Sequence, residues 1–478
     1  MKNILSSAIF LFLLTSCAYT QSKDITQRIH DVETHLSGWI QTQHDGQWTL
    51  AARMAHYRLK GLSIAVIDNY KVDWAKGYGW ADSSEGRQVT TATLFQAASI
   101  SKSLNGVGVL RLVQDEKLDL NVDVNQYLKD WKFPYDSVSK GKKITLAELP
   151  SHTAGLTVHG FPGYDINDSL PTIPQILDGQ RPANNPRIRS MSEPGLSPAV
   201  YSGGGITLSQ LVVMNSTGLP YDTYMRDSIL QPMGMTGSFY TQPAPADKKT
   251  LLATGYRANG VALHGRSHVY PEQAAAGLWT NPTDLAHYII ATQQSLDGQA
   301  GGVLSPATTK LRLTPFIDSS AALGVFILQR GDDKYFSHGG ANEGFRSQYY
   351  GSLHGGRGVV VMVNSDNGAI MDEIINSVAS VYKWEGFYKP VVKTEIDAPA
   401  PLDQYTGQYA LGSDTVRVFQ KEGKIFLDVR FDQWQLHFVT ADEFFLYDQK
   451  GDFQFTRGNG RVSSILVNHQ QTYKKINQ

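Results

Sequence analysis

The chain has 478 residues, of which 41% are hydrophobic and 18% are charged. At roughly 100–200 residues per domain this length predicts two or three folded units, and the composition excludes a disordered chain. The 43 basic residues nearly balance the 44 acidic ones, which excludes nucleic-acid binding through a general basic field, and a single cysteine excludes an intrachain disulfide or a cysteine-rich metal site.

The N-terminus carries the pattern of a targeting signal. Lys2 precedes an apolar run, Ile4–Leu14, which is too short as a helix to cross a bilayer. The only cysteine, Cys17, follows directly, so residues 1–16 resemble a bacterial lipoprotein signal peptide ahead of a lipidated cysteine. That resemblance implies a lipoprotein anchored to a periplasm-facing membrane, with Ala18 favouring the outer membrane. The alternative is an ordinary secretory signal and a soluble secreted or periplasmic protein.

Strand and helix patterns follow along the next part of the chain. Hydrophobic periodicity and turn residues first predict a hairpin of Ser63–Asp68 and Val72–Trp80, and then a helix over Ser99–Gln114 with one apolar face. A proline-rich loop region at 120–200 follows, with further helices from near Thr207 and from Pro282. The last predicted elements are strands at Tyr335–His338, Arg346–Leu353 and Gly358–Asn364, and a helix over Ala369–Trp384. This order predicts an α+β fold, an antiparallel sheet flanked by helices, with a helical and loop-rich subdomain.

The C-terminal part has a different pattern. Prolines mark residues 387–401 as a linker, which follows a main domain at 17–386. Beyond it, at 402–478, short apolar runs alternate with turn residues, which predicts a small all-β barrel or meander. The runs are Val416–Val418, Lys424–Val429, Leu436–Val439, Phe444–Tyr447, Phe453–Phe455, Val462–Val467 and Thr472–Lys475.

One serine–lysine pair is a candidate for nucleophilic catalysis. Ser99 and Lys102 are three residues apart at the start of a predicted helix, so the amine can reach the hydroxyl on one helix face. A hydroxyl needs such a base to become a good nucleophile. The same spacing at Ser137/Lys140, Ser139/Lys142 and Ser380/Lys383 does not open a helix. Helix capping is the structural alternative for Ser99.

Two further segments carry candidate site residues. Tyr201 begins a Tyr-Ser-Gly segment, and its phenol serves as a base only beside a cation such as Lys102; a packed aromatic is the alternative. His338 begins a His-Gly-Gly-Ala segment after an apolar strand edge, where glycines let a substrate approach the backbone closely. His354-Gly355-Gly356 has a similar pattern but is predicted to be a hairpin turn.

Taken together and in this order, the three segments resemble the serine β-lactamase-like family, which includes class C β-lactamases, penicillin-binding DD-peptidases and related esterases. The resemblance covers about residues 25–385, and Ser151–Leu156 and Ala275–Leu278 match further family landmarks. It implies that Ser99 is acylated, that Lys102 and Tyr201 move its proton, and that His338 tunes the site. It also implies that Gly339, Gly340 and Ala341 line the substrate strand, with the N–H groups of Ser99 and Ala341 as the oxyanion hole. The 402–478 region resembles lipocalin-like modules appended to some members.

One position departs from the family pattern. The second motif usually ends in asparagine, whereas this chain has Gly203 there, at the substrate-binding side of the site. The missing amide lowers the expectation of efficient β-lactamase activity and favours esterase or broad amidase activity. We therefore expect a serine hydrolase for D-amino-acid peptides, amides or esters, with weak β-lactamase activity, no cofactor and no metal; His264 and His268 are not a convincing metal pair. A non-catalytic binder of penicillin or cell-wall fragments is the alternative. A small-molecule or peptide substrate is the expected partner.

Overall fold

The computed structural model describes residues 24–43, 48–299, 302–412, 414–429, 432–447 and 449–476. Their contacts divide these residues into two compact units, one formed by 24–29 and 58–371, and the other by the described residues of 30–57 and 372–478. The predicted signal peptide and Cys17 lie outside the described residues.

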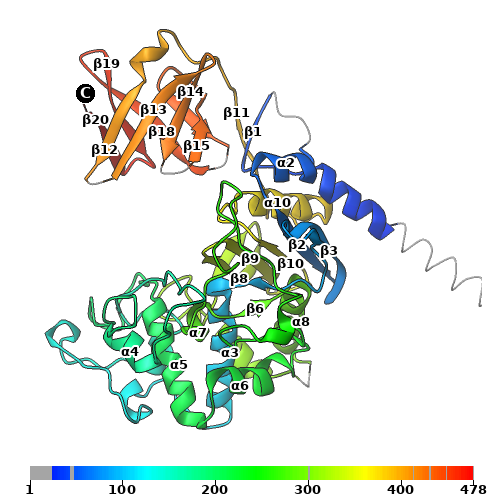
Figure 1. Cartoon of the computed structure of the whole chain (residues 1–478), viewed down its shortest axis with the longest axis vertical. Coiled ribbons are helices and arrows are strands. Elements are labelled where there is room, and N and C mark those ends of the chain that lie inside the picture. Colours follow the sequence, from blue (N-terminus) through cyan, green and yellow to red (C-terminus); the bar gives the residue numbers. More distant parts are fainter. Residues whose placement is uncertain are drawn as a thin grey trace, which may run out of the picture. The chain divides into compact units, whose positions relative to one another are not determined.

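A seven-stranded antiparallel sheet forms the centre of the first unit (Figure 1). Its strand order is β4-β3-β2-β10-β9-β8-β7, so the first hairpin of the chain lies beside strands that come almost 300 residues later. The strands are β2 Gly61–Asp68, β3 Lys71–Asp82, β4 Arg87–Gln88, β7 Phe326–Arg330, β8 Asp333–Asn342, β9 Phe345–Ser352 and β10 Gly358–Val363. This confirms the predicted antiparallel sheet, built from the early hairpin (β2 and β3) and the three predicted late strands (β8, β9 and β10). β7 was not predicted.

The helices of the first unit lie on the sheet and beside it. α8 packs across β2, β3, β9 and β10, and it begins where the sequence predicted, because the Asn281 side chain accepts a hydrogen bond from Asp284 N–H. The bounds are α3 Ser101–Gln114, α4 Ile173–Asp178, α5 Gly203–Thr217, α6 Tyr221–Met225, α7 Gln273–Ala276, α8 Pro282–Leu296 and α9 Pro306–Arg312, with a small sheet of β5 Phe95–Gln96 and β6 Trp279–Thr280.

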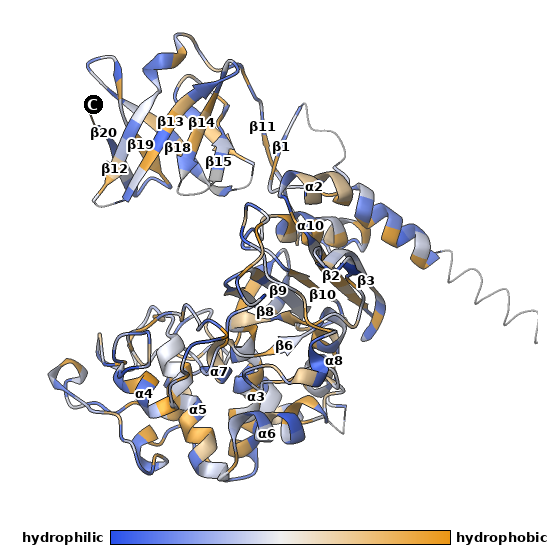
Figure 2. Cartoon of the chain, viewed as in Figure 1, coloured by the Kyte–Doolittle hydropathy of each residue, from blue (hydrophilic) through white to orange (hydrophobic). Residues whose placement is uncertain are grey.

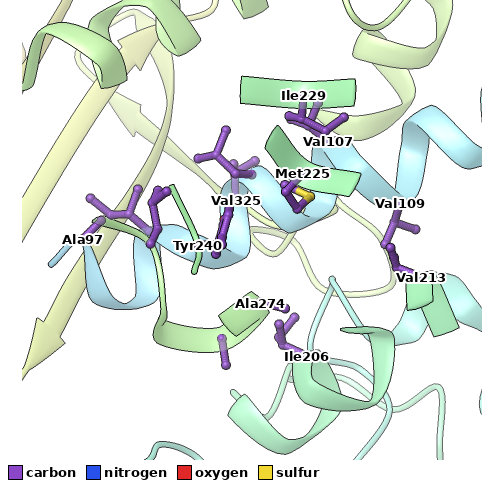
Figure 3. Packing of buried hydrophobic residues seen from close by; sticks show 14 of the residues in the cluster. Ala97, Val107, Val109, Ile206, Val213, Met225, Ile229, Tyr240, Ala274 and Val325 are labelled. Carbon is purple, nitrogen blue, oxygen red and sulfur yellow. The ribbon is translucent and has the colours of Figure 1, made fainter. Parts of the chain in front are cut away.

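α3 is buried on all sides, which corrects the prediction of a single apolar face. Every residue of Ser101–Leu110 is buried, and small residues on its other faces allow close neighbours. A Cβ on Gly106 would meet Leu323 O at 2.5 Å, and one on Gly108 would meet Met225 Sδ at 2.8 Å. Figure 3 shows the apolar side chains that surround this helix. The catalytic candidates therefore stand on a rigid central element.

α5 begins at Gly203 and not near Thr207, so the predicted start was four residues late. The Ser202 hydroxyl caps the helix by accepting a hydrogen bond from Gly205 N–H at 2.9 Å. The three glycines of the first turn, Gly203, Gly204 and Gly205, allow it to approach neighbouring backbone. A Cβ on Gly204 would lie 2.8 Å from Thr157 O.

The region at 120–200 is loop-rich, as predicted, with α4 and short 3₁₀ turns at Val124–Gln126, Ser137–Ser139 and Leu146–Glu148. Lys140 and Lys142 both form ion pairs with Glu193. Their amines thus contact the carboxylate of Glu193, and not the serines three residues before them. This agrees with the choice of Ser99 over the other serine–lysine pairs.

The second unit combines a short N-terminal segment with the C-terminal part of the chain. β1 Ile40–Thr42 pairs in parallel with β11 Val391–Lys393, which lies inside the predicted linker. Arg53 in α2 Leu50–His56 donates to both carboxylate oxygens of Glu373 in α10 Ile370–Val381. The two segments are therefore joined by strand pairing and by a buried ion pair.

The rest of the second unit is a nine-stranded antiparallel sheet that curls into a nearly closed barrel. It confirms the predicted small β-barrel and adds two strands that were not predicted, β12 and β15. The strands are β12 Gly407–Leu411, β13 Asp414–Lys421, β14 Lys424–Val429, β15 Asp432–Gln435, β16 His437–Phe438, β17 Glu443–Leu446, β18 Gln449–Gly458, β19 Arg461–Val467 and β20 Gln471–Ile476.

Aromatic and aliphatic side chains fill the interior of this barrel. Figure 2 shows hydrophobic and hydrophilic residues alternating along its strands, as a sheet with one buried face requires. Tyr405, Tyr409 and Phe455 are fully or almost fully buried, and the rings of Tyr405 and Phe455 lie 4.8 Å apart. The interior is therefore a packed core.

Candidate active site

A tight turn between β5 and α3 holds Ser99. The residue lies in a 3₁₀ turn, Ala98–Ile100, and Ala98 has φ +51°, a conformation that residues with a Cβ rarely adopt. Hydrogen bonds fix this turn: Ala97 N–H donates to Leu278 O at 2.8 Å, and Ser347 Oγ donates to Ala97 O at 2.9 Å. The Ser99 N–H lies in the first turn of the helical segment, where N–H groups lack intrahelical acceptors.

Lys102 lies one turn further, and its amine reaches Ser99. Lys102 Nζ is 2.9 Å from Ser99 Oγ and donates to Ala275 O at 2.7 Å. The side chain is only 2% exposed. Ala275 belongs to the second landmark segment noted in the sequence, so that segment orients the lysine toward the serine.

Tyr201 lies over the lysine. Lys102 Nζ is 4.9 Å from the centre of the Tyr201 ring, and the His152 ring centre is 4.4 Å from that of Tyr201. The structure thus brings together the Ser99 hydroxyl, the Lys102 amine and the aromatic ring of Tyr201. His152, which the sequence indicated only as a fold landmark, belongs to this cluster. Its Nδ1 accepts a hydrogen bond from Ser202 N–H at 3.2 Å, so its ring holds the start of α5.

His338 joins the cluster from β8. Its ring centre lies 6.1 Å from that of Tyr201, and its Nδ1 donates to Gly339 O at 2.6 Å. Nε2 therefore carries the lone pair, and it is buried with no hydrogen-bond partner among the described residues. Burial, reinforced by the electrostatic effect of the neighbouring Lys102, lowers the pKa of His338 to about 3. His338 is a neutral acceptor at physiological pH.

Backbone geometry explains how β8 faces the serine. β7 pairs with β8 only as far as Ser337 among the described strands, while β9 continues along the other edge. Leu353 N–H donates to Lys334 O, and bonded pairs alternate in an antiparallel ladder, so Lys334 and every second residue after it face β9. Ala341 is an odd-numbered residue and does not belong to this series. Its N–H therefore points to the open edge of β8, and Ala341 and Ser99 line the same cavity.

That cavity has a volume of about 380 Å³ and opens above Ser99. Its lining consists of Ser99, Tyr201, Phe326, His338, Gly339, Gly340, Ala341, Ser347, Gln348 and Met371. Six of the predicted site residues thus line the cavity. A seventh, Lys102, lies directly beneath it, next to Ser99. Phe326 was missed because β7 has no clear sequence signal. Gln348 follows from hairpin register, since it pairs with Gly339.

Gly203 does not line this cavity, in contrast to its expected place among the substrate-binding residues. It is buried at the start of α5, where an added Cβ would lie 3.0 Å from the Phe161 ring and 3.3 Å from His159 O. The His159 side chain in turn contacts Tyr201 O through Nδ1 at 2.5 Å. The segment around residues 159–161 therefore leaves little room for a side chain at position 203, where the family carries asparagine.

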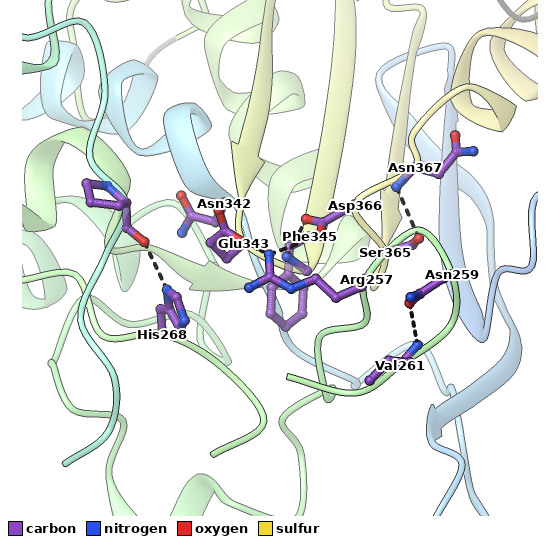
Figure 4. Close-up of polar contacts among 12 residues, drawn as sticks. Arg257, Asn259, Val261, His268, Asn342, Glu343, Phe345, Ser365, Asp366 and Asn367 are labelled. Carbon is purple, nitrogen blue, oxygen red and sulfur yellow. Dashed lines mark hydrogen bonds and ion pairs between the residues drawn. The ribbon is translucent and has the colours of Figure 1, made fainter. Parts of the chain in front are cut away.

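The far end of β8 is held by a polar cluster (Figure 4). Arg257 forms ion pairs with Glu343 and Asp366, and Asp366 Oδ1 accepts a hydrogen bond from Gly344 N–H at 2.7 Å. Glu343 and Gly344 form the turn that follows Ala341 and Asn342. The cluster therefore fixes the hairpin that presents the cavity strand.

No group of three or more potential metal ligands occurs among the described residues. His264 Nδ1 is 2.7 Å from Asp165 Oδ2, and His268 Nδ1 donates to Pro162 O, also drawn in Figure 4. The two histidines thus have separate structural partners. The part of the chain that the structure describes contains no helix of the length and hydropathy needed to span a membrane.

An α+β domain with a helical subdomain, and a Ser-x-x-Lys serine beneath an open strand edge, is typical of the serine β-lactamase and penicillin-binding superfamily. A family model described as Beta-lactamase matches residues 48–381, and the chain belongs to this family, as the sequence resemblance indicated. Among curated relatives, the protein named Flp of Staphylococcus aureus strain N315 is 26% identical over 243 residues, which cover 48% of this chain and 45% of Flp. The match thus spans less than half of that relative's length.

Solved structures support the same fold. The octameric penicillin-binding protein homologue from Pyrococcus abyssi superposes with a TM-score of 0.61 at 18% identity, over 89% of this chain and 98% of that one. The D-amino acid amidase from Ochrobactrum anthropi SV3 gives a TM-score of 0.58 at 19% identity, over 75% of this chain and 98% of the amidase.

Proposed function

We propose that this protein is a serine hydrolase that works through an acyl-enzyme intermediate on an amide or ester substrate. The observation that carries the proposal is the 2.9 Å distance between Lys102 Nζ and Ser99 Oγ, directly beneath a cavity edged by Tyr201 and the His338 strand. A hydroxyl becomes a competent nucleophile only with such a base at hydrogen-bond distance.

The reaction follows from these positions. Ser99 Oγ attacks the substrate carbonyl carbon, and its proton passes to the Lys102–Tyr201 pair. The N–H groups of Ser99 and Ala341 stabilise the oxyanion, each donor worth about 3 kcal/mol in comparable sites. Collapse of the tetrahedral intermediate breaks the bond to the amine or alcohol, which leaves with the proton. Water, activated by the same pair, then releases the acid and regenerates the hydroxyl.

The cavity favours substrates without a charged group beside the reacting carbonyl. Its described lining residues include no Lys, Arg, Asp or Glu, and His338 is neutral because its pKa is lowered to about 3. Gly203 offers no side-chain amide to orient a β-lactam or peptide side chain. Esters and D-amino-acid amides with an acylated α-nitrogen are therefore better candidates than β-lactams, for which we propose weak turnover. The fold shared with a D-amino acid amidase is compatible with this choice.

The test is turnover by wild type and Ser99→Ala across p-nitrophenyl esters, D-alanyl amides and peptides, and nitrocefin. We expect wild type to hydrolyse neutral esters and amides faster than nitrocefin, and Ser99→Ala to lose at least about 10³-fold of the best activity, because loss of the nucleophile removes the covalent route. Absence of turnover together with stoichiometric binding of a cell-wall fragment would instead favour a non-catalytic binder.

We also propose that Cys17 carries a lipid anchor that holds the protein at a periplasm-facing membrane. The support is the short apolar run that ends just before the only cysteine of the chain. Palmitate labelling in a bacterial host should mark wild type and not Cys17→Ser. Equal labelling, or a fully soluble wild type, would contradict the anchor.

A further inference from the structure

A second, larger cavity lies in the first unit, with a volume of about 620 Å³. It is bounded by the β3–β4 hairpin, the segments 242–253 and 265–269, and β6, and it shares no lining residue with the cavity above Ser99. Its size falls within the roughly 300–1,000 Å³ typical of small-molecule sites. Nothing in the proposed hydrolytic reaction uses it.

The inner wall of this cavity is apolar. Trp279 and Val269 are almost completely buried in the fold, at 1% and 3% exposure, yet both line the cavity together with Leu252 and Ile166. Trp279 and Val269 form the closed floor, while the accessible apolar surface comes from Ile166, which is exposed, and from the partly exposed Leu252 and Ala244. This surface gains free energy when an apolar body displaces water from it.

Charged residues at the cavity have a positive excess. Arg87, Lys249 and Arg266 are lining residues, against the single carboxylate of Glu85. Glu85 contacts Arg266 at 2.6 Å and Arg87 at 3.2 Å, so one carboxylate serves two guanidinium groups.

A second carboxylate, Asp82, lies behind Arg266 at 3.6 Å and outside the lining. Its hydrogen bonds to Ser84 and Thr254 outweigh burial and hold its pKa at about 2, so it is ionised, and the local balance remains one positive charge. Lys249 is solvent-exposed, and its ammonium has no ion-pair or hydrogen-bond partner among the described residues, so it is available to a ligand.

We propose that this cavity is a binding site for an aliphatic carboxylate of medium chain length, with the chain against Leu252 and Ile166, above the buried Trp279, and the carboxylate at Lys249. The apolar wall and an unpartnered cation at one cavity match the two ends of such a molecule. The site is separate from the catalytic one, so binding does not depend on the Ser99 nucleophile.

The wall of this site is connected to the strand that carries the oxyanion N–H. Gln96 Nε2 donates to His268 O at 2.7 Å, and Gln96 Oε1 accepts a hydrogen bond from Asn342 Nδ2 at 2.9 Å. His268 lines the second cavity, and Asn342 directly follows Ala341. A ligand that displaced the His268 segment would therefore shift Gln96 and, through it, Asn342 in β8.

The test uses the Ser99→Ala protein, so that hydrolysis and binding at the nucleophile do not interfere. Decanoate, decanol and decyltrimethylammonium share one chain and differ in head-group charge; their binding is followed by calorimetry and tryptophan fluorescence. We expect saturable binding of decanoate that is at least about fivefold tighter than that of decanol, with the cation weakest.

Lysine variants supply the matched control. Lys249→Gln should weaken decanoate about fivefold, whereas Lys248→Gln, which removes a neighbouring cation outside the cavity lining, should change it less than twofold. Ala244→Phe, which fills the cavity from its lining, should abolish binding while thermal stability is retained. Equal affinity for decanoate and decanol, equal effects of the two lysine variants, or no saturable binding would overturn the proposal.

Discussion

At the scale of single residues, Gly203 and Phe161 explain how this chain differs from its family around Tyr201. An asparagine at 203 would place its Cβ 3.0 Å from the Phe161 ring. We expect Gly203→Asn alone to destabilise the protein by about 1–3 kcal/mol through overpacking, and the double variant with Phe161→Ala to recover part of that loss. Urea unfolding measures both effects. A single variant as stable as wild type would show that the ring does not restrict this position.

Substitutions at Gly203 and Phe161 should also change the substrate preference. If the asparagine amide is what β-lactam orientation lacks, acylation by nitrocefin should rise in Gly203→Asn/Phe161→Ala relative to Phe161→Ala, which serves as the control. The ester rate of the two proteins should be similar.

The buried neutral state of His338 predicts a specific pH dependence of stability. Its folded pKa, about 3, lies below the unfolded value near 6.5, so its stabilising contribution is present above pH 6.5 and is lost as the pH falls toward 3. Between pH 7.5 and 5.0 this amounts to about 2 kcal/mol of unfolding free energy. His338→Asn should remove that part of the loss, whereas His152, whose pKa is also lowered by burial, still contributes. Equal pH slopes for both proteins would contradict a neutral His338.

At the scale of secondary-structure elements, α3 shows why a helix in the centre of a domain carries small residues. Gly106→Ala would bring a methyl group 2.5 Å from Leu323 O, a backbone atom that cannot rotate away. We expect a loss of about 2 kcal/mol or more in unfolding free energy. Gly160→Ala, at a position with no atom within 4 Å and no positive φ, is the control and should be nearly neutral. Similar losses in both variants would contradict this account of the packing.

Elements with a clear period or cap were predictable from sequence. The Asn281-Pro282 cap and the hairpin around Asn69 and Tyr70, both of which have positive φ, follow from local chemistry. The start of α5 and the burial of α3 on all sides could not be predicted from local sequence. Glycine usually indicates a loop, whereas in these helices it permits close contact with residues far away in the chain. The same holds for β7, whose pairing with β8 is a tertiary property.

The site could be predicted only in part for the same reason. Ser99, Lys102, Tyr201 and His338 were identified by motif order, and the structure brings them to one cavity; their catalytic roles stay predictions. Gly203 was placed on the substrate side, but it lies beneath Phe161. Phe326 and the contact of His152 with Tyr201 depend on how separate segments pack, which local spacing does not encode.

At the scale of the whole molecule, the cavity above Ser99 is built entirely from residues 99–371, while the β-barrel has a packed core of its own. We therefore expect a protein truncated after Pro401 to hydrolyse small esters within about threefold of wild type. A selective loss on large substrates would indicate that the barrel contributes to their binding. Loss of turnover of the smallest ester, with Ser99 still accessible to a small covalent probe, would contradict the assignment of all catalytic groups to one domain.

Mass spectrometry after covalent labelling tests most directly whether a hydroxyl, activated by Lys102, performs the chemistry. Wild type, Lys102→Ala and Ser99→Ala are each treated with a fluorophosphonate, digested and sequenced. The proposed mechanism predicts a single adduct on Ser99 in wild type, formation slowed at least about 10²-fold in Lys102→Ala, and no adduct in Ser99→Ala. An adduct on another residue, or equal labelling of all three proteins, would contradict it.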